Sequence, residues 1–210
     1  METYLTEEER LEALQRWWKE NKSSIFGGLL LGLAVIAGWK MWQGSQRETA
    51  EQASLVYHQL AEAVQARQNE AAVKLGERLV QQYPKTTYGE YGRLFLARLK
   101  VDAGDLDGAR RTLEEALSQT RDEALAGLIR LRMARVLLAK GDSEATLKLL
   151  DGVSEKAAGQ YAGLYTELRG DALVVAKRPA DARAAYAKAR ELGDHSPLLE
   201  LKLNDLPAAP

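Results

Sequence analysis

The chain contains no cysteine, and only five prolines and two histidines among its 210 residues. Without cysteine it forms no disulfide, holds no metal through thiolates and carries no lipid on a cysteine. The two histidines, His58 and His195, are far apart, and neither has a second ligand at metal-binding spacing or a nucleophile in a recognisable turn. The Gly-x-Gly and Gly-Lys patterns that cradle phosphates are also missing. We therefore expect no enzyme activity, no metal and no cofactor.

An excess of charge of one sign is missing too, because 29 Lys and Arg residues balance 30 Asp and Glu residues to a formal net charge of -1. Such a balance gives no general attraction to nucleic acid, and we expect none to bind. Paired carboxylates such as Glu114-Glu115 fall on helix faces, where solvated charge is the ordinary role. The scarcity of proline and of alternating β-branched runs predicts an all-α fold.

One segment is apolar enough to enter a membrane. Residues 25–39 (IFGGLLLGLAVIAGW) carry no charge. At about 1.5 Å per helical residue, residues 23–42 are long enough to cross a hydrocarbon core of roughly 30 Å, and two tryptophans lie where an interfacial aromatic belt belongs. The sequence therefore predicts a transmembrane helix over residues 23–42. The side chains expected in the membrane include Ile25, Leu30, Leu33, Trp39 and Trp42.

Two other interpretations of this segment remain open. A buried core helix can be equally apolar, although the alternating charges on both sides and the glycine content favour lipid. A cleaved signal peptide is the stronger alternative, because Val35-Ile36-Ala37 offers small residues at the spacing that a signal peptidase uses. Against it, the residues before the apolar run are many and rich in glutamate, whereas the leading region of a signal peptide is short and positive.

The orientation follows from lysine and arginine near the span, since these residues resist translocation. Four precede the uncharged run of residues 25–39, and only Lys40 and Arg47 follow this run over a similar distance. This bias predicts a cytoplasmic segment over residues 1–22 and a periplasmic domain over residues 43–210. Residues 1–22 contain a capping box at Thr6-x-x-Glu9 and the pair Trp17-Trp18, which predicts an amphipathic helix, either partly in the membrane interface or solvated.

The rest of the chain contains an internal repeat. Aligning Ala97, Ala134 and Gly170 brings three similar segments together, 37 and 36 residues apart, with Ala61 in a weaker fourth copy. Each segment has a small residue in mid-helix, then a turn, and then an alanine that begins the buried face of the next helix. Those alanines are Ala109, Ala145 and Ala182. Small residues let paired helices approach closely, and pairs must stack to bury their second apolar face. The pattern predicts a solenoid of about four helix pairs with a C-terminal capping helix.

The turns of this repeat carry helix-ending and helix-starting signals. Gly104 and Gly141 are expected to end helices, and the aspartate after each is expected to cap the next one. Pro179 suits a helix start, because its missing amide hydrogen does no harm there. Further expected caps are Asn69 and either Thr86 or Thr87.

In such a solenoid the first helix of each pair lines a concave side where peptides or partner helices bind. The repeat columns assign Tyr91, Leu94, Arg98, Val101 and Asp102, then Leu128, Leu131, Arg135 and Leu138, then Leu164, Glu167, Asp171 and Val174 to that side. Arg98 and Arg135 are equivalent positions that could hold a client's carbonyls or carboxylates. Two alternatives remain: the arginines pair with a neighbouring repeat's glutamate or point to water, and the leucines belong to the core.

These repeats resemble the tetratricopeptide family over residues 53–190, with a longer period and without its early tryptophan. The acidic leading helix, the single span, and the segments YPKTTYGEYGRLFLARLKVDAGD, LIRLRMARVLLAKGD and ARAAYAKA together resemble the YfgM family, the ancillary subunits of the bacterial SecYEG translocon. The resemblance implies a non-enzymatic inner-membrane protein that associates with SecYEG and with the periplasmic chaperone PpiD, and that assists exported polypeptides.

Two other functions remain open at this stage. The chain could be a membrane-tethered scaffold for another envelope assembly, since a helical-repeat fold does not fix a function. It could also be a regulator of a cytoplasmic stress-response factor that acts through its N-terminal segment. The apolar residues after His195 are expected to form the capping helix, with a partner-binding segment as the alternative.

Overall fold

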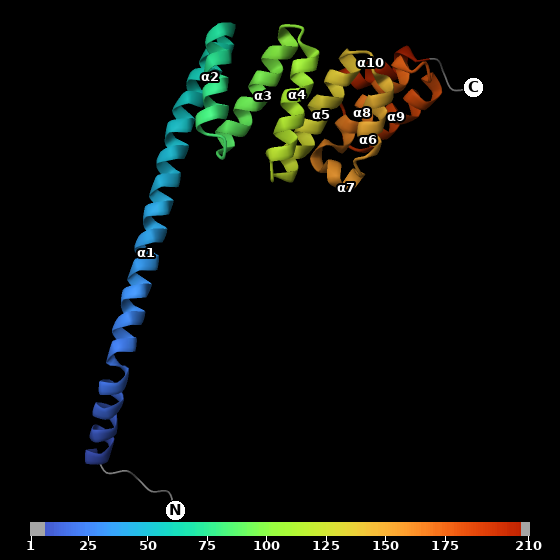
Figure 1. Ribbon diagram of the computed structural model, residues 1–210. Coiled ribbons are helices and arrows are strands. Elements are labelled where there is room, and N and C mark those ends of the chain that lie inside the picture. The colour runs from blue at the N-terminus through green and yellow to red at the C-terminus, as the bar shows by residue number, and fades with distance from the viewer. Residues whose placement is uncertain (1–6, 207–210) are drawn as a thin grey trace, which may run out of the picture. The chain divides into compact units, whose positions relative to one another are not determined.

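The computed structural model describes residues 7–206, and every regular element in this range is a helix (Figure 1). The elements are α1 (Glu7–Gln65), α2 (Asn69–Gln82), α3 (Thr87–Asp102), α4 (Leu106–Gln119), α5 (Glu123–Ala139), α6 (Ser143–Asp151), α7 (Glu155–Ala158), the 3-10 turn η1 (Gly159–Tyr161), α8 (Ala162–Val175), α9 (Pro179–Glu191) and α10 (Pro197–Asp205). The predicted all-α class is confirmed. The capping box expected at Thr6 lies outside the described residues.

The chain divides after Glu51 into two units. In the part of the chain that the structure describes, the first unit consists of the N-terminal part of α1, and its large apolar side chains are exposed. The window that makes α1 long and apolar enough to cross a membrane has no buried residues. Trp39 is 62% exposed and Leu30 is 68% exposed. A core helix would bury such residues, so the absence of any packing partner among the described residues argues against that interpretation.

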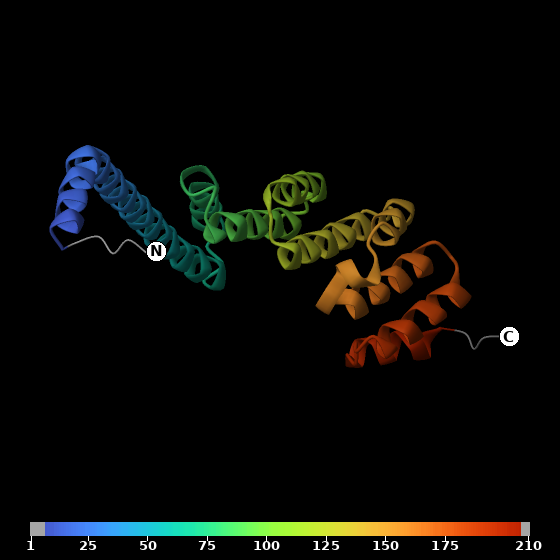
Figure 2. The same cartoon turned by 90° about the horizontal axis from the view of Figure 1, so that it is seen from below.

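The second unit is a stack of antiparallel helix pairs. The end of α1 packs against α2 in one core cluster, α3 pairs with α4, α5 with α6, and α8 with α9, and the pairs follow one another in chain order (Figure 2). Buried alanines and leucines fill the space within and between pairs in four clusters. The predicted helical-repeat solenoid is therefore confirmed.

Small residues lie at the helix crossings as the repeat alignment predicts. Ala97 and Ala134 are buried, and the backbone of Gly170 lies against the ring of Tyr186, where a Cβ atom would come within 2.3 Å of the ring. The repeat alignment is shifted by one residue at two places. Leu60 rather than Ala61 is fully buried in the first pair, and Thr146 rather than Ala145 is fully buried at the start of α6.

Local signals also place the helix ends. Gly104 and Gly141 have φ values of 78° and 79°, a region that favours glycine. The carboxylates of Asp105 and Asp142 then accept hydrogen bonds from the backbone amides of Gly108 and Ala145. Pro179 is the first residue of α9, as predicted. Thr86 caps α3 through Gly89, with Thr87 as the first helical residue.

The prediction for Asn69 was wrong. It is the first residue of α2, and the residue before it, Gln68, makes no side-chain capping hydrogen bond. The preceding turn instead reverses through Arg67, whose φ is 56°.

Helix α10 covers the end of the stack. Its Leu199 and Leu203 are buried in a cluster with Leu173 and Tyr186, whereas Leu198 and Leu201 are exposed. The amino group of Lys202 donates hydrogen bonds of 2.7 Å to Glu167 and 2.8 Å to Asp171, both on α8. Burial by itself lowers the pKa of Lys202, but these hydrogen bonds outweigh it and hold the pKa above its usual value.

Candidate partner-binding groove

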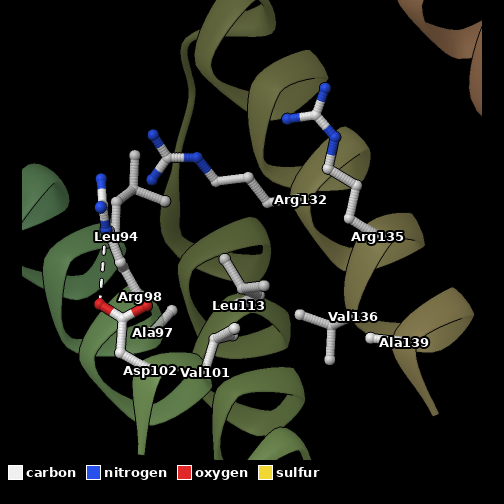
Figure 3. A pocket seen from close by; sticks show the side chains of 10 residues that line it. All are labelled: Leu94, Ala97, Arg98, Val101, Asp102, Leu113, Arg132, Arg135, Val136 and Ala139. Carbon is white, nitrogen blue, oxygen red and sulfur yellow. Dashed lines mark ion pairs between the residues drawn. The ribbon is translucent and has the colours of Figure 1, made fainter.

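A cavity of about 400 Å³ opens between α3, α4 and α5 (Figure 3). Buried apolar side chains form its floor, among them Leu94, Leu113 and Val136. The complete lining is Leu94, Ala97, Arg98, Val101, Asp102, Leu113, Arg132, Arg135, Val136 and Ala139. The first helices of two successive pairs, α3 and α5, thus contribute nearly all of this surface.

Positive charge is concentrated at this cavity. Figure 3 shows Arg132 extending from α5 towards Leu94 and Arg98 on α3. Arg98 has one carboxylate partner, Asp102, at 3.6 Å on its own helix, and both side chains are more than half exposed. Among the side chains that the structure describes, Arg132 and Arg135 have no hydrogen-bond or ion-pair partner. Three arginines therefore face a single carboxylate.

Arg132 is the least exposed of these three arginines. Burial lowers the pKa of its guanidinium, and the positive charges of Arg135 and Arg98 lower this pKa further. Arginine nevertheless stays charged in proteins at any ordinary pH. The protein therefore keeps a partly desolvated positive charge here without a counter-ion, which costs free energy.

A second cavity of about 260 Å³ continues the first one, because the two share Leu94, Arg98 and Arg132. Its other lining residues are Tyr57, Tyr91, Phe95 and Leu128. The ring of Tyr57 lies 5.9 Å from that of Tyr91 and 5.8 Å from that of Phe95, measured between centroids. We call the two cavities together, with the lining residues named above, the basic-aromatic groove.

Most of the residues that the repeat columns assign to the second and third pairs do line this groove. They are Tyr91, Leu94, Arg98, Val101, Asp102, Leu128 and Arg135. Leu131 is a correction: it is 1% exposed and packs in the core cluster that also contains Leu150 and Tyr165. Leu138 is partly buried against the same cluster and is not part of the groove lining.

The fourth pair does not extend the groove, which corrects the second part of the expectation. Leu164 is partly buried in the cluster around Leu131. Glu167 and Asp171 bind Lys202 of α10, and Asp171 also accepts a 2.8 Å hydrogen bond from the hydroxyl of Tyr186. Val174 is exposed but lines neither cavity of the groove. The groove therefore belongs to the first three pairs alone.

The sequence analysis did not assign every groove residue to this side; the missed residues include Arg132 and Tyr57. Arg132 lies three residues before Arg135, which places both on one helix face, so this spacing could have revealed it. Tyr57 comes from α1, in the repeat copy whose alignment was one residue out. No local signal in the sequence connects Tyr57 with α3, because their contact depends on how the pairs stack.

Comparison with known proteins gives consistent results. A family model described as a tetratricopeptide repeat-like domain matches residues 15–208. The ancillary SecYEG translocon subunit of Escherichia coli K12 is 33% identical over 98% of this chain and 99% of its own length. That of Haemophilus influenzae is 31% identical over 96% and 98%. That of Neisseria gonorrhoeae is 27% identical over 98% and 100%.

Solved structures support the fold alone. MamA from Desulfovibrio magneticus has a TM-score of 0.56 at 16% identity, over 72% of this chain and 81% of that one. A tetratricopeptide repeat protein from Parabacteroides merdae has a TM-score of 0.55 at 16% identity, over 72% of this chain and 56% of that one.

Proposed function

We propose that this chain, which belongs to the tetratricopeptide repeat-like family of ancillary SecYEG translocon subunits, is a non-enzymatic accessory subunit of that translocon. One observation carries the proposal. The similarity to the Escherichia coli subunit covers 98% of the chain, so it includes the exposed apolar helix as well as the repeats. A likeness limited to the repeats would support only the fold.

In this proposal residues 23–42 span the bacterial inner membrane, with residues 1–22 in the cytoplasm and the repeat domain of residues 43–210 in the periplasm. The exposed apolar surface of α1 supports the span, because lipid would cover side chains that nothing in the described chain covers. The charge bias across the span supports the orientation. The repeat domain then contacts PpiD and exported polypeptides as they leave the translocon, and the short tether keeps it close to them.

Affinity purification of the tagged full chain from membranes in a mild detergent tests the association. We expect SecY, SecE and SecG to co-purify, with PpiD enriched alongside them. A tagged single-span protein of unrelated sequence, expressed at the same level, is the control for unspecific recovery. If the translocon is recovered no better than with this control, the proposed function is wrong.

The cysteine-free sequence allows a direct test of the orientation, because a single introduced thiol is then the only reactive one. Glu12 and Glu144 are both exposed and lie on opposite sides of the span in the sequence. In intact spheroplasts, a membrane-impermeant maleimide should label Glu144→Cys and not Glu12→Cys, and should label both after lysis. Labelling of Glu12→Cys alone in intact spheroplasts would contradict the proposed orientation.

A further inference from the structure

We infer that the basic-aromatic groove binds a short extended segment of a partner polypeptide in which a carboxylate side chain neighbours a large apolar one. The carboxylate lies between Arg132 and Arg135, and the apolar side chain packs on the floor or against the aromatic rings. This inference names the partner chemistry of the proposed function. It depends on the proposed function only for the place in the cell where the partner binds.

The arginines of the groove indicate that the partner supplies a carboxylate. Some surface arginines elsewhere on the repeat domain have carboxylate partners, such as Arg169 with Asp151 at 2.8 Å and Arg178 with Asp181 at 2.7 Å, whereas Arg111 and Arg121 have none among the described side chains. The groove differs in that two arginines without a partner among the described side chains, Arg132 and Arg135, line one cavity, where burial and then the positive charge of Arg135 lower the pKa of Arg132. A carboxylate from outside would relieve this repulsion, and a guanidinium binds a carboxylate through two parallel hydrogen bonds.

The apolar surface of the groove indicates that the partner also supplies a large apolar side chain. Beside the arginines lie the buried Leu94 and Leu113, and Tyr91 and Val101 are still 37% and 38% exposed. A small inorganic anion would leave this surface in water, whereas a segment with both kinds of side chain covers it. Aromatic rings and arginines are also the residues that most often supply binding energy at protein interfaces.

The repeat geometry limits the length of the segment. Arg98 and Arg135 occupy equivalent positions in successive pairs, but the third equivalent residue, Asp171, has the opposite charge and binds Lys202. The basic surface therefore ends at α5. Packed helices lie roughly 10 Å apart, a distance that an extended chain covers in about three residues. A carboxylate and an apolar side chain within three or four residues of each other suffice to contact both α3 and α5.

Binding of two peptides to the full-length protein in detergent micelles tests this inference. The acidic probe is a capped, rhodamine-labelled peptide of sequence Ala-Phe-Glu-Leu-Glu-Phe-Ala, and the neutral probe has glutamine in place of both glutamates. By fluorescence anisotropy, we expect the acidic probe to bind at least about tenfold more tightly than the neutral one. Raising the salt concentration from about 0.05 M to about 0.5 M should remove most of this difference.

The variant Arg132→Gln with Arg135→Gln should lose at least about tenfold in affinity for the acidic probe. The matched control is Arg169→Gln with Arg178→Gln, which changes the net charge equally at paired arginines outside the groove and should bind as the wild type does. Charge reversal of both groove arginines to glutamate, combined with a probe that carries lysine instead of glutamate, should restore binding. This restoration would exclude loss of folding as the cause.

Equal affinity of the wild type for both probes, or an equal loss in the groove variant and in its matched control, would overturn the inference. Recovery of SecYEG with the same proteins is measured in parallel. Peptide binding without translocon recovery would overturn the proposed function and leave the groove chemistry standing. Translocon recovery without selective peptide binding would overturn the inference about the groove and leave the proposed function standing.

Discussion

Replacing Lys202 by methionine is expected to lower the free energy of unfolding of the repeat domain by about 2–4 kcal/mol. The substitution leaves the carboxylates of Glu167 and Asp171 close together without their shared cation. Glu167 is 8% exposed, so water cannot replace the lost hydrogen bond. The expected cost lies below that of a fully buried pair, because the side chain of Lys202 is 24% exposed. Urea unfolding followed by circular dichroism measures it.

Two companion variants separate this cause from a general loss of packing. Lys188→Met removes an exposed ion pair with Glu191, and should cost less than about 0.5 kcal/mol. Adding Glu167→Gln to Lys202→Met should recover part of the lost stability, since it removes the carboxylate that was left unpaired. A double variant less stable than Lys202→Met alone would contradict this explanation.

The same network makes stability depend on alkaline pH. The pKa of Lys202 is raised by its carboxylate partners, and burial followed by the hydrogen bond to Asp171 raises the pKa of Tyr186. Because the folded state holds both protons more tightly than the unfolded chain, this stabilisation is complete below about pH 10 and is lost as the pH rises through the folded-state pKa values. Lys202→Met should therefore show a smaller loss of stability in that range than the wild type does.

Replacing Gly170 by alanine is expected to destabilise the repeat domain by about 2–3 kcal/mol. Alanine in place of glycine within a helix normally stabilises it by up to about 1 kcal/mol, so the sign of the effect is diagnostic. Here the new Cβ atom would lie 2.3 Å from Cε1 and 2.4 Å from Cδ1 of the Tyr186 ring. Tyr186 is only 2% exposed and has no room to retreat without losing its hydrogen bond to Asp171.

The matched control for this change is Gly152→Ala, where the nearest atoms would be at an ordinary 3.5 Å and φ is -71°. That variant should change the free energy of unfolding by less than about 0.5 kcal/mol. If the clash is the cause, Gly170→Ala should lose most of its cost in a Tyr186→Leu background, because the ring is gone. Equal costs in both backgrounds would show that Tyr186 is not the reason.

The architecture could be predicted from the sequence because its signals are local. A turn glycine followed by aspartate marks each helix junction at Asp105 and Asp142, and the buried Ala97, Ala134 and Gly170 recur at nearly constant spacing. The alignment failed by one residue where it assumed the same spacing for every repeat. Counting from the helix ends instead identifies Leu60 and Thr146 as the equivalent buried residues.

The groove could be predicted only in part, because repeat columns assign a helix face but not what covers it. Arg98 and Arg135 keep their positions on the groove lining. Leu131 and Asp171 occupy equally favourable columns, yet the packing around η1 and α8 buries the first, and α10 binds the second through Lys202. Both of these contacts depend on how distant segments pack, which no periodicity encodes.

The proposed function and the inferred groove chemistry together require that the side of the solenoid between α3 and α5 contacts polypeptides at the translocon. A photo-crosslinking amino acid at Ala139, which is exposed at the groove, tests it most directly in cells that export protein. We predict adducts with exported polypeptides or with SecYEG and PpiD, lost in Arg132→Glu with Arg135→Glu, and absent from the same probe at Glu144. Identical adducts from both positions, or adducts unchanged by the charge reversal, would contradict the claim.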